Sequence, residues 1–184
     1  NMNVVNILQG YDAIEIIVAG GVVRHSDGGV VGEAAVDFIR QFKADYAGIY
    51  MYHCGTAPAL HHIGNSMYGA IVIDPPGLPA VDHEYVLVQS EIYTGPEGAP
   101  GDLTKMQNDA WDAVVFNGYV NQYQHRPVRV EPDQRIRIWV LDAGPSENSS
   151  FHVIGTIFDT VFKEGSYVLQ PDESRGGSQA LDLQ

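Results

Sequence analysis

Four residues within one short stretch have the types and spacing of a redox-active metal site. Cys54, the only cysteine of the chain, directly follows His53, and the stretch continues to His62 and Met67. A thiolate, an imidazole and a thioether from one loop are the soft ligand set of a blue-copper centre, in which methionine is the weak axial ligand. The spacing therefore predicts a copper site whose second imidazole has to come from elsewhere.

The position of His53 next to Cys54 adds a second prediction. Adjacent residues on a strand point to opposite faces, so the two side chains can serve two different metals on opposite sides of one strand. The peptide between them would then be a short covalent path for an electron. This arrangement indicates redox chemistry.

Each of these residues also has a simpler interpretation. A single cysteine is usually a small buried hydrophobic residue, and Met67 taken alone would be core filler. The combined spacing makes chance agreement a poor explanation, and we favour the copper site. His61 competes with His62 for the ligand role; we assign that role to His62 and place His61 beside the site.

His152 lies in the apolar run SSFHVIG. An imidazole in such a run costs free energy unless it is hydrogen-bonded, so it could be a satisfied core histidine. A histidine is also the natural proton donor for a reaction that consumes protons. The residues alone leave these two interpretations equal.

The elements that must position these residues are predicted to be strands. FKADYAGIYMYHC and MYGAIVIDPP indicate two strands flanking the ligand loop, and a proline-rich connection follows over 74–84. Short strands separated by turn residues are expected over 84–93, 113–118, 127–144 and 149–162. Within 127–144, Arg135, Arg137 and Trp139 alternate with the aliphatic residues Ile136, Ile138 and Val140. This alternation is typical of a strand with one face buried. The spacing of these short strands along the chain, with no long helix among them, predicts an antiparallel sandwich or barrel.

Residues 1–40 fit this pattern less well. DAIEIIVAGGVV suggests a strand and GEAAVDFIRQF a short helix, with no motif in either.

Composition excludes two classes of partner. The formal net charge of −13, with only 10 Lys and Arg, disfavours a nucleic-acid partner. No apolar stretch approaches the roughly 18 residues that a membrane-spanning helix needs. The first residues lack the pattern of a signal peptide.

The region from about Phe42 to Gly165 resembles the copper-containing nitrite reductases, which are trimers of two-domain cupredoxin subunits. The resemblance rests on FKADYAGIYMYHCGTAPALHHIGNSMYGAIVIDP, EYVLVQSEIYTG, VVFNG and SSFHVIGTIFDTVFKEG, in the order of the family. It implies an all-β fold of tandem cupredoxin-like Greek-key β-sandwiches. We expect domain 1 over 1–78, with 1–41 atypical, and domain 2 over 79–184, with its C-terminus truncated.

The resemblance also implies roles for individual residues. Cys54, His62 and Met67 would bind the type 1 copper that receives electrons, and His53 would bind the type 2 catalytic copper. His152 would relay protons to nitrite, and Ile154 would crowd the bound anion. The implied reaction is the one-electron reduction of nitrite to nitric oxide, with two protons consumed and water released.

Further expectations come from the same resemblance. The partners would be nitrite, a small electron-donor protein (a cupredoxin or a cytochrome c) and two further subunits of a homotrimer with an intersubunit copper site. The location would be periplasmic or otherwise extracytoplasmic.

Two other functions stay open: an electron-transfer cupredoxin without nitrite turnover, and a laccase-like multicopper oxidase relative. The oxidases have His-Cys-His at this strand, whereas Gly55 follows Cys54 here, which favours nitrite reductase.

The chain departs from the family where further ligands are expected. The histidine-rich motif that precedes the cysteine in the family is missing, and His25, in RHSDGG, is the only upstream histidine. We keep His25 as an additional candidate ligand. No residue matches the type 2 histidine that the family places near the end of its second domain.

Overall fold

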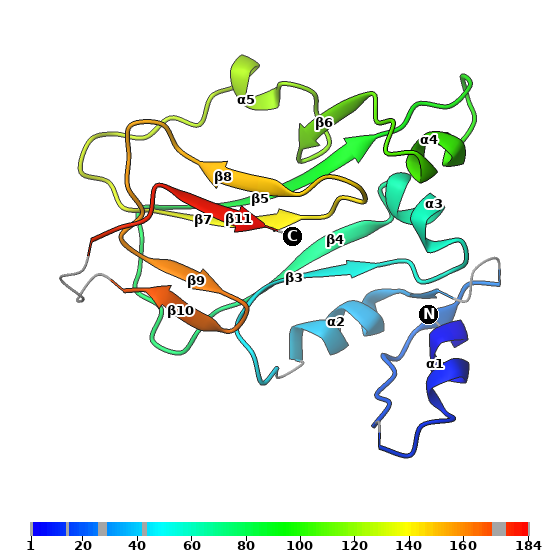
Figure 1. The fold of residues 1–184 in the computed structure, drawn as a ribbon. Coiled ribbons are helices and arrows are strands. Elements are labelled where there is room, and N and C mark those ends of the chain that lie inside the picture. The colour runs from blue at the N-terminus through cyan, green and yellow to red at the C-terminus, as the bar shows by residue number, and fades with distance from the viewer. Residues whose placement is uncertain (1, 14, 26–28, 42–43, 171–175, 184) are drawn as a thin grey trace.

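Strands dominate the computed structural model, which describes residues 2–13, 15–25, 29–41, 44–170 and 176–183 (Figure 1). The strands are β1 (Val22–Val23), β2 (Val30–Val31), β3 (Gly48–His53), β4 (Tyr68–Ile73), β5 (His83–Ile92), β6 (Ala113–Phe116), β7 (Ile136–Asp142), β8 (Ser149–His152), β9 (Val161–Lys163), β10 (Ser166–Leu169) and β11 (Ala180–Leu183). The helices are α1 (Met2–Leu8), α2 (Glu33–Gln41), α3 (Ala59–Gly64), α4 (Leu103–Gln107) and α5 (Gln122–His125). This confirms the predicted all-β class.

Strand β5 is the centre of a three-stranded sheet in the order β6-β5-β7. Its sequence, HEYVLVQSEI, is rich in residues that favour strands. It pairs antiparallel with β6 and parallel with β7, with Val86 opposite Trp139. The parallel pair corrects the expectation of a purely antiparallel arrangement. Such a pair needs a crossover, and the chain from β6 to β7, which includes α5, provides it.

The remaining strands form antiparallel pairs. β3 pairs with β4, β9 with β10, and β8 with β11. The ligand loop predicted from the sequence is the connection of the β3–β4 hairpin, and it contains α3.

The core lies around β5. The side chains of Tyr93, Val115, Trp139 and Met106 are almost completely buried, at 2%, 2%, 6% and 1% exposed. The alternation predicted for β7 does not divide buried from exposed residues, because Trp139 is buried whereas Ile136 is 37% exposed. The Trp139 indole Nε1 donates a hydrogen bond to Glu84 Oε1 at 2.7 Å, which satisfies its polar group in the interior.

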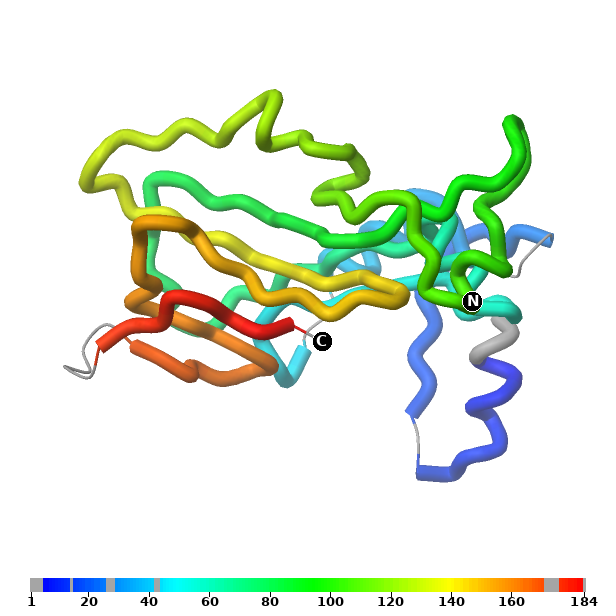
Figure 2. The backbone as a smooth tube through the Cα atoms, turned by 45° about the horizontal axis from the view of Figure 1, so that its top comes forward, coloured from blue at the N-terminus to red at the C-terminus, as the bar shows by residue number. Residues whose placement is uncertain are grey.

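The N-terminal segment differs from its prediction. The helix expected in GEAAVDFIRQF is present as α2, but the strand expected over DAIEIIVAGGVV is reduced to the two residues of β1. Figures 1 and 2 show α1 and the chain after it projecting away from the sheets.

None of the helices in the described ranges is long and apolar enough to span a bilayer.

Candidate copper site

The β3–β4 hairpin places the predicted ligands at its closed end. Strand β3 ends at His53, opposite Tyr68, and the pairing continues one step further because the Cys54 N–H donates to the Met67 carbonyl at 2.9 Å. This bond brings the backbones of two predicted ligands together although they lie thirteen positions apart in the sequence.

His62 and Met67 face one another across the loop. Nδ1 of His62 lies 3.2 Å from Sδ of Met67. His62 and Cys54 are half-buried, and Met67 is 37% exposed. The loop therefore presents a thiol, an imidazole nitrogen and a thioether sulfur, which are the donor types that suit a blue-copper ion.

His61 is turned to a different partner. Its Nε2 lies 2.9 Å from the carbonyl oxygen of Gly101, in the loop before α4. A carbonyl can only accept, so Nε2 carries the proton and is the donor in this contact. That nitrogen is engaged in the protein's own hydrogen bonding, which supports the assignment of the ligand role to His62.

His53 is exposed at the end of β3, and its Nδ1 lies 3.1 Å from the carbonyl oxygen of Cys54. By the same reasoning Nδ1 is the donor, which leaves Nε2 as the nitrogen that could bind a metal. The contact also joins the two residues by a hydrogen bond parallel to their peptide bond.

His152 is exposed at the end of β8, not buried in an apolar strand as its neighbours in the sequence suggested. Its Nδ1 donates to the carbonyl of Gln179, next to β11, and Nε2 is left for other partners. Ile154 is 92% exposed. Among the described residues, therefore, both side chains stand open to solvent.

The remaining ligands are not brought together here. All seven histidines and the cysteine lie in the described ranges, and within those ranges no three His, Cys, Asp or Glu side chains gather as a metal site would require. His25 lies exposed in the turn between β1 and β2. Cys54, His62 and Met67 remain the predicted ligands of a first copper, and the described residues do not supply a complete second copper site.

A buried polar cluster behind the β5 sheet was not foreseen from the sequence. The Glu91 carboxylate, 4% exposed, accepts hydrogen bonds from the Tyr93 hydroxyl and from the backbone N–H groups of Ser146 and Glu147. Burial raises the pKa of Glu91 and raises that of Tyr93 to about 12. The alternation of polar and apolar residues in β5 carries no sign of Ser146 and Glu147, which lie 55 and 56 positions further along the chain than Glu91.

The fold is similar to those of solved copper nitrite reductases. The fold resembles a copper nitrite reductase structure from Nitrosomonas europaea, with a TM-score of 0.61 and 37% identity over 77% of this chain and 50% of that chain. The chain is thus a β-rich protein of the cupredoxin-like kind. A search of protein-family models found no match.

The amino-acid sequence is also similar to those of curated copper-containing nitrite reductases. The copper-containing nitrite reductase of Neisseria gonorrhoeae is 40% identical over 159 residues, which cover 79% of this chain and 41% of that protein. The resemblance to copper-containing nitrite reductases predicted from the motifs is confirmed. The chain spans less than half the length of this curated relative.

A second, shorter similarity is to a different kind of protein. The glycerol-3-phosphate regulon repressor of Escherichia coli is 50% identical over 46 residues, which cover 25% of this chain and 18% of the repressor.

Proposed function

We propose that this chain carries the electron-entry part of a copper-dependent nitrite reductase, which reduces nitrite to nitric oxide. The observation that carries the proposal is the 3.2 Å approach of His62 Nδ1 to Met67 Sδ in the loop that begins at Cys54. Copper bound by these type 1 ligands would supply reversible one-electron chemistry.

The hairpin then gives the electron two short routes from Cys54 to His53. One is the peptide bond between them, and the other is the hydrogen bond from His53 Nδ1 to the Cys54 carbonyl. His53 would hold the type 2 copper through Nε2. The other type 2 ligands would come from outside this chain, at an intersubunit site of a homotrimer.

His152 would manage protons. Its Nδ1 is engaged by the Gln179 carbonyl, so Nε2 is the atom that would hold and release a proton. Nitrite, one electron and two protons give nitric oxide and water, so a proton donor is needed near the anion. Ile154 would crowd nitrite once a neighbouring subunit covers its exposed side chain. A small cupredoxin or cytochrome c would donate the electron, in a periplasmic or other extracytoplasmic location.

The experiment is copper loading of the full chain, followed by visible and EPR spectroscopy. We expect a strong thiolate-to-copper band, and nitric oxide production from nitrite when the missing type 2 ligands are supplied. Absence of the thiolate band after loading would refute the proposal.

A second candidate is an electron-transfer cupredoxin without nitrite turnover. The described residues favour it in one respect, because His53 and His152 take part in no cluster of metal-binding side chains. A thiolate band without any type 2 EPR signal or nitrite turnover, under every condition of assembly, would support this candidate.

A further inference from the structure

The N-terminal segment, residues 2–41, has almost no core. Among its residues with described side chains only Ala35 is buried. Large apolar side chains stand in solvent, with Ile7 68%, Val22 71% and Ile39 53% exposed. A unit of this size cannot bury enough apolar surface to hold itself together. Its apolar faces fit a larger fold than the segment itself provides.

The similarity to nitrite reductases and the similarity to the repressor fit two different parts of the chain. The nitrite reductase match covers 79% of it and the repressor match 25%, which add to 104%, so the two can lie side by side with a small overlap. The nitrite reductase motifs begin at about Phe42. The 46 repressor-like residues therefore fit at the N-terminus, where the upstream histidine-rich motif is missing.

We infer that residues 1 to about 46 have a separate descent, from a repressor-type fold, and contribute no copper ligand. Only 18% of the repressor is matched. The apolar faces of the segment are exposed because the rest of that fold, which would cover them, is not part of the match. The absent type 1 and type 2 imidazoles then have to be supplied from outside this chain. His25 belongs to the repressor-like segment and is not a ligand.

Two measurements on the full chain test this inference. In the copper-free protein, Val36→Asp in α2, a residue 48% exposed, is expected to leave the urea midpoint unchanged. The matched change Val115→Asp in β6, where the side chain is 2% exposed, is expected to abolish cooperative unfolding. A large fall of the midpoint in Val36→Asp would overturn the inference, because it would show that α2 is part of the folded core.

Copper loading provides the second measurement. His25→Ala is expected to leave copper stoichiometry and the thiolate band as in the parent chain. Loss of either would show that the segment holds a ligand. The urea experiment needs no copper, so it stays decisive even if the proposed function fails.

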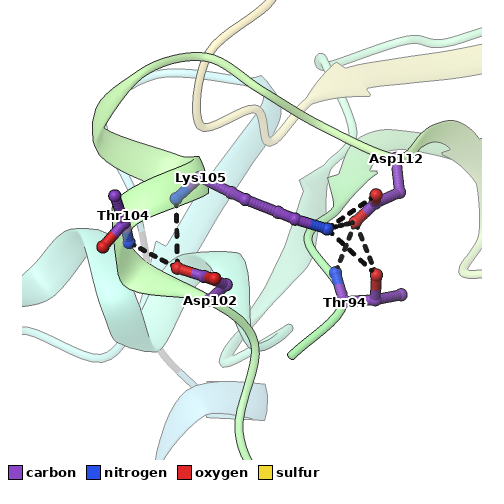
Figure 3. Close-up of polar contacts among 5 residues, drawn as sticks. All are labelled: Thr94, Asp102, Thr104, Lys105 and Asp112. Atoms are coloured by element: carbon purple, nitrogen blue, oxygen red, sulfur yellow. Dashed lines mark hydrogen bonds and ion pairs between the residues drawn. The ribbon is translucent and has the colours of Figure 1, made fainter. Parts of the chain in front are cut away.

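A different set of contacts concerns helix α4, which is firmly attached to the β6-β5-β7 sheet (Figure 3). The Asp102 carboxylate caps the helix by accepting from the N–H groups of Thr104 and Lys105 at 2.8 and 3.2 Å. The Lys105 ammonium lies 2.8 Å from both Asp112 oxygens, and Asp112 also accepts from the N–H and hydroxyl of Thr94 at 2.7 Å. These contacts tie α4 to the ends of β5 and β6.

The same region is joined to the copper-ligand loop by two hydrogen bonds, and a third within the loop links the two residues that make them. The Gly101 N–H donates to Asn65 Oδ1 at 2.7 Å, and Asn65 Nδ2 donates to the His61 carbonyl at 2.6 Å. The His61 Nε2 bond to the Gly101 carbonyl, at 2.9 Å, completes the set. Asn65 lies between His62 and Met67 in the sequence, so its side chain acts on the segment that carries both ligands.

Packing reinforces these hydrogen bonds. Met106 of α4 is 1% exposed and lies against Gly64, where an added Cβ would come within 2.6 Å of the Met106 sulfur. A side chain at position 64 would therefore displace the buried Met106 side chain. Helix α3, which carries His62, is thereby pressed against α4.

We propose, on the basis of the function proposed above, that Asn65 is a positioning residue for the type 1 copper. Through Gly101 it fixes the loop to α4 and thus to the sheet, which holds His62 and Met67 at their observed approach. A loop that is already ordered loses less conformational entropy when it binds copper, so we expect it to bind the ion more tightly and to release it more slowly.

The test compares Asn65→Ala with Asn108→Ala in the full chain. Asn108 makes a similar side-chain hydrogen bond, to the Thr104 carbonyl at 2.7 Å, but within α4 and away from the loop. Asn65→Ala removes two bonds and is expected to speed amide exchange of Gly101 in the copper-free chain, and copper transfer to a chelator, each about tenfold. Asn65→Asp keeps the acceptor for Gly101 and should be intermediate. Asn108→Ala should change neither rate.

The outcomes separate the two proposals. If the parent chain shows no thiolate band, the proposed function fails, whereas Gly101 exchange still tests the contact between loop and helix. If copper binds and Asn65→Ala matches the parent chain in both rates, the positioning role is refuted.

Discussion

Replacement of Tyr93 by phenylalanine tests the buried polar cluster most directly. The Tyr93 hydroxyl lies 2.6 Å from Ser146 Oγ and donates to Glu91 Oε2 at 3.2 Å, while the side chain is only 2% exposed. Phenylalanine keeps the buried ring and removes only the hydroxyl. A buried group left without its hydrogen-bond partner costs about 1–3 kcal/mol, so we expect Tyr93→Phe to lower the free energy of unfolding by about 2 kcal/mol at pH 8.

The loss should depend on pH through Glu91. Burial raises the pKa of Glu91 in the folded chain, so its protonated form favours folding, and that contribution is lost as pH rises above the ordinary value of 4.5. At pH 8 the ionised carboxylate needs the Tyr93 hydroxyl more than the protonated form does. The difference in stability between Tyr93→Phe and the parent chain is therefore expected to be larger at pH 8 than at pH 4.5.

Urea denaturation followed by the fluorescence of the two tryptophans measures both effects. Tyr119→Phe is the matched control, because Tyr119 is 68% exposed and its substitution should change stability by less than about 0.5 kcal/mol. A Tyr93→Phe variant that unfolds at the same urea concentration as the control would refute the reasoning.

Three further predictions concern the copper site and the attachment of α4. Cys54→Ser is expected to abolish the thiolate band after copper loading, since a hydroxyl cannot replace the thiolate; a persisting band would remove Cys54 from the site. His152→Ala should lower nitrite turnover in the assembled enzyme and leave that band intact, so loss of the band would contradict a role in proton delivery. The contacts with Lys105 and Thr94 lower the pKa of Asp112 to about 2, so its contribution to stability is present above pH 3.8 and is lost as pH falls through about 2. Asp112→Asn should thus be less stable than the parent at pH 7 and equal to it near pH 2, as measured by thermal unfolding.

Several features of the fold could be predicted from local pattern. The strands β3, β4 and β5 follow from runs of β-branched and aromatic residues between turn signals, and α2 follows from helical spacing of apolar residues. The parallel pairing of β5 with β7 could not be predicted, because strand neighbours depend on chain crossovers and not on residue spacing. The strand expected before β1 failed for a related reason: an apolar run forms a strand only where another strand or a core receives it.

The sequence by itself determined the chemistry of the ligand loop. Cys54, His62 and Met67 belong to one hairpin connection, so their spacing along the chain sets which donors can meet. Tertiary structure alone decided that His61 is engaged by Gly101, forty positions away, whereas His62 faces Met67. It also decided that His152 is exposed and that Trp139 is buried. The contacts of His61, His152 and Trp139 join segments far apart in the sequence, so they cannot be predicted from the local spacing of residues.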